Sequence, residues 1–439
     1  MSVVTYTQLR FSRGFNILLV LSAIGVVAIA YRFIVGLGAV TNLSDGYPWG
    51  FLTGVNKLTQ IALAAGGFVM AGIIHIFGGH RFHRVARSAI LAALLGYILF
   101  ISALIVDLGR PWNLYWALVS WNHYSPMFEV AWCVLLYSFV LSIEFLPVVF
   151  ERFRLRRAIE LFHAWVPILI VMILTLFTFV MTGSRMWTIA VFGLLAIWEI
   201  LMRWEILPRD KQMPLLLIAA GIMFSTLHQS TLGSLFLIVD RLSPLWYSPF
   251  LPVIFFASAV AAGPSMVILE RLLTTKIRRR PVEMDLVVPL ARAMPYVIAT
   301  YIFIRVADLV VRNAVFETVS ISQESIWFWL EMWMLIISMA LYANLDALPR
   351  KASLLLAASA SVLAVVVHRV GVTMIGMSVP EYPPYVPLWL EVVIGIGLLA
   401  LGLLAYRLIV HFFPVYEEGT HQELSDKDTV ETVLATTRS

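Results

Sequence analysis

The 439-residue sequence contains a single cysteine, Cys133, and few charged residues. One cysteine excludes a disulfide framework and any zinc or iron–sulfur site built from several cysteines. Asp, Glu, Lys and Arg make up only 13% of the chain, whereas hydrophobic residues make up 61%. A soluble domain could not hide so much apolar surface in one core. The composition therefore indicates a polytopic membrane protein, in which any electron transfer would use clusters brought by another chain.

The formal net charge of +5 does not indicate nucleic-acid binding. No basic stripe with interleaved base-stacking aromatics is present, and the Lys and Arg residues fall in short loops between apolar runs. We therefore expect membrane lipid around the chain and no nucleic-acid partner.

Twelve apolar runs are long enough to cross a bilayer, since about 20 residues at about 1.5 Å each span the hydrocarbon. We place them at 15–38, 52–77, 87–106, 127–150, 162–182, 186–205, 213–236, 248–273, 286–311, 325–346, 351–376 and 386–412. The first run is longer than a signal-peptide core and is expected to be retained as a helix. The sequence predicts an all-α polytopic membrane protein with one transmembrane domain over 1–412 and a polar cytoplasmic tail over 413–439.

Basic residues set the expected orientation, because cytoplasmic loops retain Lys and Arg. Alternate loops carry clusters of cations: Arg10 and Arg13; Arg81, Arg84 and Arg87; Arg152, Arg154, Arg156 and Arg157; Arg203, Arg209 and Lys211; Arg271, Lys276, Arg278, Arg279 and Arg280; Arg350 and Lys351. Both termini are therefore expected in the cytoplasm.

Polar and aromatic motifs then gather on the outer side. They are YPWG at 47–50, DLGRPWN at 107–113, WNHYSPMFE at 121–129, HQSTLGS at 228–234, WYSP at 246–249 and VPEYPPY at 379–385. Trp and Tyr belts also form at the membrane interface in proteins of any function. The ionisable residues at membrane depth are more informative than these aromatics.

Such residues must be paired, neutral or hydrated. They are Asp107, Glu129, Glu144, Glu199, His228, Arg305, Asp308, Glu331, His368, Arg369 and Glu391. Arg305 and Asp308 lie three apart on one helix face and are expected to pair with each other. His368 is expected near the outer face, where it would join His228.

Glu129 and Asp107 flank the long outer loop, and we expect them to meet His228 around one pocket. A carboxylic acid and an imidazole suit a quinone, whose carbonyl oxygens accept hydrogen bonds and then protons as electrons arrive. Gln229 beside His228 adds an amide, and Trp49, Trp112 and Phe128 are candidates for packing on the quinone ring. The alternative for His228 alone is an interfacial histidine with satisfied hydrogen bonds.

Two other functions also fit parts of the pattern. A b-type haem needs two axial ligands on facing helices, and His75 with His163 or His228 with His368 would be the pairs. A secondary transporter would share the twelve helices and the intramembrane acids. However, no strong internal repeat is visible in the sequence.

The ordered motifs resemble a known family. YPWG, a GG pair at Gly66, DLGRPWN, EFLPVVFER at 144–152, and HQSTLGSL followed by PLW resemble the integral membrane (HybB-type) subunit of periplasmic nickel–iron hydrogenases. That subunit belongs to the polysulfide-reductase membrane-subunit (NrfD/PsrC-like) superfamily, and the resemblance extends from Phe15 to about His411.

The resemblance implies a core of two four-helix bundles and a haem-free, quinone-reactive anchor in a bacterial or archaeal inner membrane, with its functional face periplasmic. The quinone would be menaquinone or ubiquinone. The implied partners are a periplasmic four-cluster ferredoxin-like iron–sulfur subunit and a catalytic subunit, either a hydrogenase or another enzyme.

By motif, the implied site residues are Asp107, Trp112, Glu129 and His228, with Glu129 handling protons and Glu144 relaying them. If protons come from the cytoplasm, the path would use Glu144, Glu199, Glu331 or Glu391. The chain departs from the hydrogenase-type subunit between Arg152 and His228, where two extra helices near 162–205 are expected.

Overall fold

The computed structural model describes residues 12–75, 79, 82–204, 215–239, 241–278, 282–347, 349–377 and 382–416. Within these ranges the chain is helical apart from turns and an isolated bridge between Leu242 and Met377, and it forms no strand. Twelve helices in the described part are long and apolar enough to cross a membrane. The prediction of an all-α, multi-pass membrane protein with twelve spans is confirmed.

Four spans form a first bundle, in which each neighbour contacts the next in a closed ring. It consists of the segment made by η2 (Leu52–Leu58), α2 (Thr59–Ala64) and α3 (Gly66–His75), followed by α4 (His83–Asp107), α6 (Pro126–Phe153) and α9 (Leu215–Ser234). The turn η5 (Leu235–Ile238) extends the last helix.

The next four spans form a second closed ring. They are α10 (Leu251–Arg278), α11 (Met284–Val311), α12 (Gln323–Ala343) and α13 (Arg350–Val370), which η7 (Gly371–Ile375) extends. The two bundles meet where α10 packs against α2, α3 and α9. The expected core of two four-helix bundles is present.

Both bundles follow the same order along the chain, so corresponding helices cross the membrane in the same direction. This is a structural repeat that the sequence did not reveal. Short helical turns lie at the face opposite the start of α1, which we call the outer face: η1 (Leu37–Ala39), η4 (Pro111–Tyr115), α5 (Trp116–Val119) and η6 (Val315–Val319).

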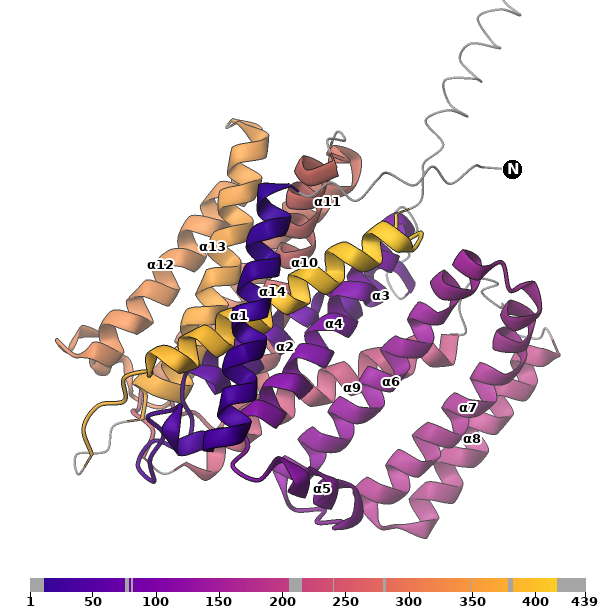
Figure 1. The fold of residues 1–439 in the computed structure, drawn as a ribbon, viewed down its shortest axis with the longest axis horizontal. Helices are drawn as coiled ribbons and strands as arrows, with labels where there is room; N and C mark the ends of the chain where they lie inside the picture. Colours follow the sequence, from indigo (N-terminus) through magenta and orange to yellow (C-terminus); the bar gives the residue numbers. More distant parts are fainter. Residues whose placement is uncertain are drawn as a thin grey trace, which may run out of the picture.

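Helices α1 (Arg13–Val35) and α14 (Trp389–Phe412) pair with each other and lie across the bundles in Figure 1. Their backbones touch at Gly25 and Gly397, where a Cβ on either glycine would overlap the backbone of the other helix. The start of α1 and the end of α14 lie at the same face of the molecule (Figure 1), as expected for two termini on one side of the membrane.

Helices α7 (Arg156–Thr182) and α8 (Arg185–Arg203) form a hairpin at the edge of the molecule (Figure 1). Gly183 adopts a left-handed conformation with φ of 61°, and the Ser184 side chain accepts a hydrogen bond from the Trp187 amide. A C-terminal glycine and an N-cap serine together make this tight turn. Helix α7 packs on α6 and α9, whereas α8 packs mainly on α7. The two helices expected as an addition are therefore a peripheral pair.

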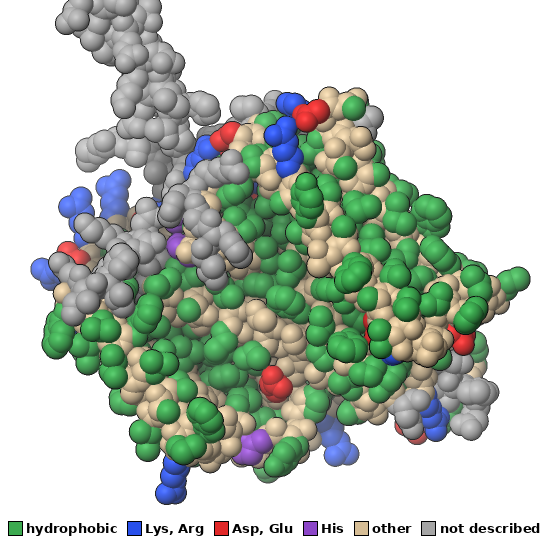
Figure 2. All heavy atoms as spheres, turned by 180° about the vertical axis from the view of Figure 1, so that it is seen from behind, with side chains coloured by type: hydrophobic (Ala, Val, Ile, Leu, Met, Phe, Trp, Pro, Cys, Tyr) green, Lys and Arg blue, Asp and Glu red, His purple; other side chains and the backbone are tan. Residues whose placement is uncertain are grey.

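The face seen from behind in Figure 2 is covered largely by hydrophobic side chains, with Lys and Arg groups toward its borders. This distribution suits contact with lipid hydrocarbon. Several of the expected inner cations, including Arg10, Arg81, Arg209 and Lys211, lie outside the described residues, as does the tail from residue 417 onward.

Candidate functional site

His228 lies inside the first bundle, on α9, with none of its surface exposed. Its ring contacts Tyr97 and Phe100 of α4, with centroid distances of 5.5 Å in both cases. Neither ring nitrogen has a hydrogen-bond partner among the described residues. Because buried polar atoms nearly always have a partner, His228 needs water or a bound molecule that the chain does not supply.

Glu129 reaches the same stretch of α9 from the first turn of α6. Its Oε1 accepts a hydrogen bond of 2.7 Å from the Thr231 hydroxyl, which also bonds the Leu227 carbonyl. Thr231 follows His228 by three residues, so the two lie on neighbouring positions of one helix face. Glu129 is only half-buried and can be reached from the surface. Glu129 therefore contacts a residue that lies one helical turn from His228, and no described contact joins Glu129 to His228 itself.

Gln229 connects α9 to α2. Its Nε2 donates to the Ile61 carbonyl at 2.8 Å, while its Oε1 has no partner in the described part of the chain. The side-chain oxygen of Gln60, also buried, is unpartnered in the same way. Trp49 packs edge-on against Phe236 of η5, with centroids 5.0 Å apart. Two buried amide oxygens on α9 and α2 therefore lack partners in the described chain, and an aromatic ring packs on the turn that extends α9.

Asp107 takes a different partner from the one expected. It pairs with Lys57 of η2 at 2.6 Å and accepts a bond of 2.9 Å from the Thr53 hydroxyl. Next to it, Arg32 of α1 donates to the Val106 carbonyl at 2.6 Å. Asp107 therefore joins α4 to η2, and no described contact links it to Glu129 or His228.

Sequence reasoning missed Lys57 as a functional candidate, although a lone lysine in an apolar run was visible. It lies in a π-helical turn, a distortion frequent at functional sites. The π-helical η7 contacts η2 from the second bundle. The two distorted turns therefore meet at the outer boundary between the bundles.

The remaining aromatic candidates are separate from His228. Trp112 is 69% exposed on the outer turn η4, and Phe128 is buried against His123 and Trp132. Trp112 belongs to a surface of exposed outer-loop side chains, which we call the outer aromatic surface: Trp112, Tyr115, Trp116, Val119, Trp121 and Tyr124.

The acids expected on a proton path occupy unlike environments. Glu144 is buried on α6 and has no hydrogen-bond or ion-pair partner in the described ranges. Glu199 pairs with Arg203 at 2.8 Å on the peripheral α8. Glu391 accepts hydrogen bonds from the Asn42 and Leu388 amides at the start of α14. The contacts of Glu199 and Glu391 therefore anchor helices.

The second bundle holds a fully buried charge cluster. Glu331 accepts bonds from the Tyr301 hydroxyl at 2.5 Å and from Arg305 at 3.5 Å. The expected pairing of Arg305 with Asp308 is wrong, because Asp308 pairs with Arg312 at 2.7 Å. Three residues separate Arg305 from Asp308, but packing of α11 against α12 directs Arg305 inward to Glu331.

His368 belongs to this second cluster. Its ring contacts Trp246, Phe255 and Tyr301, and its Nδ1 lies 3.2 Å from an Arg369 nitrogen. His228 and His368 therefore occupy different bundles and do not form one pocket. Each histidine nevertheless packs on a tyrosine of the second helix of its own bundle, with centroids 5.5 Å apart in the first and 6.3 Å in the second.

The sequence matches the polysulphide reductase NrfD family over residues 39–380. A protein of Nitratidesulfovibrio vulgaris (strain Hildenborough) is 32% identical over 418 residues, which cover 93% of this chain and 95% of the relative. The probable Ni/Fe-hydrogenase 2 b-type cytochrome subunit of Escherichia coli K12 is 26% identical over 401 residues, with 90% of each chain covered. The menaquinone reductase integral membrane subunit of the same N. vulgaris strain is 31% identical over 136 residues, 31% of this chain and 32% of the relative. Since the family match and the first relative cover most of the sequence, the chain belongs to the polysulphide reductase NrfD family of membrane proteins.

Proposed function

We propose that this chain is the quinone-reactive membrane subunit of a respiratory redox complex. The observation that carries the proposal is the placement of the half-buried Glu129, through Thr231, within one turn of a buried histidine with two unpartnered ring nitrogens. The names of two relatives, a hydrogenase membrane subunit and a menaquinone reductase membrane subunit, support the same function.

The residues at this site suit proton exchange with a quinone. A bound quinone supplies a two-electron acceptor whose carbonyl oxygens take up two protons. His228 can donate a hydrogen bond to one oxygen, and Glu129 can hold a proton at Oε2 while Oε1 stays bonded to Thr231. Gln229 offers a further polar atom, and Trp49 an aromatic wall.

Glu144 lies deeper on the same helix as Glu129 and is proposed as a proton relay. A carboxylate without a partner would be costly at this depth, whereas a neutral carboxylic acid is tolerated. Glu199, Glu331 and Glu391 already bond Arg203, Arg305 and the α14 N-terminus, respectively. These contacts give the three acids structural roles.

The partner of the proposed site is a periplasmic iron–sulfur subunit joined to a catalytic subunit. The single Cys133 is buried and cannot build a cluster, so electrons must come from another chain. The outer aromatic surface lies in the loop that leads into α6 and Glu129. We propose that this loop faces the periplasm and that both termini face the cytoplasm.

We propose that the chain binds no haem, although one relative is named a b-type cytochrome subunit. His228 and His368 lie in different bundles, and each has its own aromatic neighbours. His75 packs against His83, and His163 bonds the Ile159 carbonyl. Neither pair suits two axial ligands on facing helices. A reduced-minus-oxidised optical spectrum of the purified complex tests this, since bands of a b-type haem would refute it.

The test of the proposed function is Glu129→Gln in the purified complex, assayed with menaquinone and ubiquinone analogues. We expect quinone-linked turnover to fall about 100-fold or more, as for loss of a general acid, while the partners remain bound. Glu317→Gln, at an exposed acid on the outer turn η6, is the matched control and should leave turnover unchanged. Full turnover in the Glu129 variant would remove this acid from the mechanism.

A further inference from the structure

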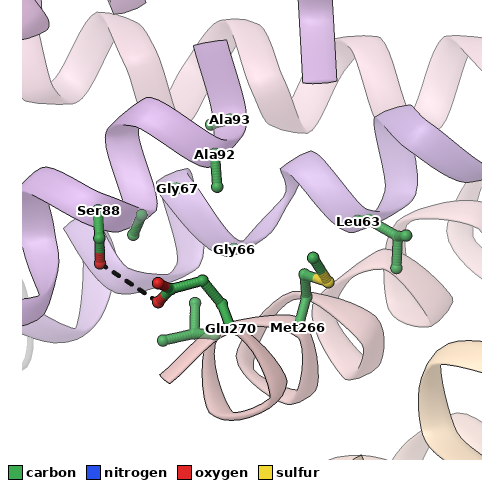
Figure 3. Close-up of a pocket in the computed structure, with 10 residues that line it drawn as sticks. Leu63, Gly66, Gly67, Ser88, Ala92, Ala93, Met266 and Glu270 are labelled. Carbon is green, nitrogen blue, oxygen red and sulfur yellow. Dashed lines mark hydrogen bonds between the residues drawn. The ribbon is translucent and has the colours of Figure 1, made fainter. Parts of the chain in front are cut away.

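A small cavity lies near the inner side, where α10 of the second bundle packs against α3 and α4 of the first (Figure 3). Its walls are mostly small residues, such as Gly66, Gly67 and Ala93. Ser88 and Glu270 form its polar end, as Figure 3 shows. The space suffices for about one water molecule, with polar partners at one side.

Glu270 is a carboxylate about two turns from the inner end of α10, and it is 9% exposed. It accepts hydrogen bonds from the hydroxyls of four side chains: Ser88 at 3.5 Å, Thr274 at 3.0 Å, Tyr406 at 2.7 Å, and Tyr416. Arg271 Nε lies 3.7 Å from its second oxygen. The carboxylate therefore touches the cavity on one side and a chain of hydroxyls on the other.

Those hydroxyls lead toward the inner side through the segment that follows α14. Residues 412–416 pass over this region, with Val415 buried and the Arg271 guanidinium 4.8 Å from the Tyr416 ring. Arg87 and Arg152 hold the segment by donating to the Pro414 and Phe412 carbonyls at 3.2 and 2.8 Å. Packed structure thus continues past residue 412, and Tyr416 lies between Glu270 and the inner side.

On its other side the cavity borders the interior of the first bundle. A Cβ placed on Gly67 would lie 3.7 Å from the Tyr137 hydroxyl, so that hydroxyl packs directly behind the cavity wall. The Tyr137 ring contacts Tyr97 at 4.7 Å, and Tyr97 contacts His228 at 5.5 Å.

Two hydroxyls on this line, those of Tyr97 and Ser225, are buried without a well-formed hydrogen bond in the part of the chain that the structure describes, although Ser225 lies near enough to interact with both Tyr97 and Tyr137. Glu144 lies beside the same helices, with its Oε1 3.1 Å from the Cβ position of Gly221. Unsatisfied buried hydroxyls need water, so the line from Glu270 to His228 is a place where ordered water is expected.

We propose that Glu270 is an inner-side proton-uptake site that supplies the quinone site of the first bundle, and that Tyr416 controls access to it. The inference rests on the proposed function. The Glu270 carboxylate takes one proton from cytoplasmic water through the Tyr416 and Tyr406 hydroxyls, and then releases it to water in the cavity. Reduction of one quinone consumes two such protons and two electrons, and the electrons come from the iron–sulfur partner.

A purely structural Glu270 would only fasten the C-terminal segment, and the experiment separates these roles. The parent complex and the Glu270→Gln variant are placed in liposomes with a trapped pH dye, a membrane-bound quinone and a membrane-impermeant reductant outside. Only complexes with their outer face outward turn over, and lumenal alkalinisation reports protons taken from the inner face. The matched control is Glu283→Gln, an acid on the same face that pairs with Arg271 at 3.3 Å without lining the cavity.

We expect Glu270→Gln to lower turnover and lumenal alkalinisation together by at least about tenfold. Binding of a quinone analogue and the melting temperature should match those of Glu283→Gln, and azide or formate, as small weak acids, should restore part of the turnover. Tyr416→Phe should slow uptake less than Glu270→Gln does, because Tyr406 still bonds the carboxylate.

Each other outcome has a defined meaning. Parent-like turnover and alkalinisation in Glu270→Gln would overturn the inference. A loss of turnover would also overturn it if weak acids do not restore the activity and the melting temperature of the variant is lower. If the parent complex reduces no quinone, the proposed function itself fails, and the inference falls with it.

Discussion

The buried charge cluster of the second bundle makes a sharp stability prediction. Glu331 and Arg305 have side chains 0% and 1% exposed, and their contact at 3.5 Å is accompanied by a 2.5 Å bond from Tyr301 to Glu331. Arg369 lies in the same cluster with its Nε unpartnered among the described atoms. Glu331→Met would therefore leave two arginines in a hydrophobic interior without an anion.

Breaking a buried ion pair from one side costs about 3–5 kcal/mol, mostly because the remaining charge is uncompensated. The additional arginine places the expected loss at the upper end of that range. Replacing both partners, with Glu331→Met and Arg305→Met together, should recover a large part of the loss, since an apolar pair of similar volume is often neutral.

The assay is the free energy of unfolding in mixed detergent micelles, followed by tryptophan fluorescence for the parent, both single variants and the double variant. Asp346→Asn, which removes two ion pairs on the surface, those with Arg292 and Arg350, is the control and should be indistinguishable from the parent. The reasoning is refuted if Glu331→Met is as stable as the parent, or if the double variant loses the sum of the two single losses.

Two further predictions concern the first bundle and the pair formed by α1 and α14. His228→Phe keeps a ring between Tyr97 and Phe100 but removes both nitrogens, so a quinone analogue should bind up to about tenfold more weakly, which is the contribution of one hydrogen bond. The affinity is measured by titration of the analogue, with His411→Phe as the control. Unchanged affinity would count against a role of His228. Gly397→Ala should destabilise the contact of α1 with α14 by about 1–3 kcal/mol, because the new methyl group overlaps Gly25. Gly193→Ala, where a Cβ meets no atom within 4 Å, should not lower the unfolding free energy, and equal effects of the two would contradict the packing argument.

The number of spans and most of their limits were predictable because they depend on composition, although the fifth run, expected from residue 162, starts at Arg156. Runs of about 20 apolar residues must be helical in hydrocarbon, and the expected limits of the fourth, 127–150, differ from α6 (Pro126–Phe153) by three residues at most. The two-bundle core followed from resemblance to a family. The internal repeat escaped notice because it lies in helix order and packing, whereas the residues inside the two bundles differ in charge.

The partners of polar residues were less predictable, because helix rotation decides them. Glu129 was expected near His228 and bonds Thr231, three residues further along the same helix. Asp107 was expected at the same pocket but pairs with Lys57, which was not among the expected site residues. Arg305 bonds a residue 26 positions away in preference to a neighbour three positions away. Glu270 was overlooked because it precedes a basic loop, where an acid usually serves as a surface counter-ion.

The peripheral hairpin has a consequence for the direction of the chain. Helix α6 ends at one face of the molecule, and α9 must start from that same face for Thr231, near its end, to meet Glu129 in the first turn of α6. An even number of crossings between α6 and α9 is the only arrangement that satisfies this parity, and α7 and α8 supply two. A single helix there would have inverted α9 and everything after it, so the hairpin keeps every later span running in its present direction.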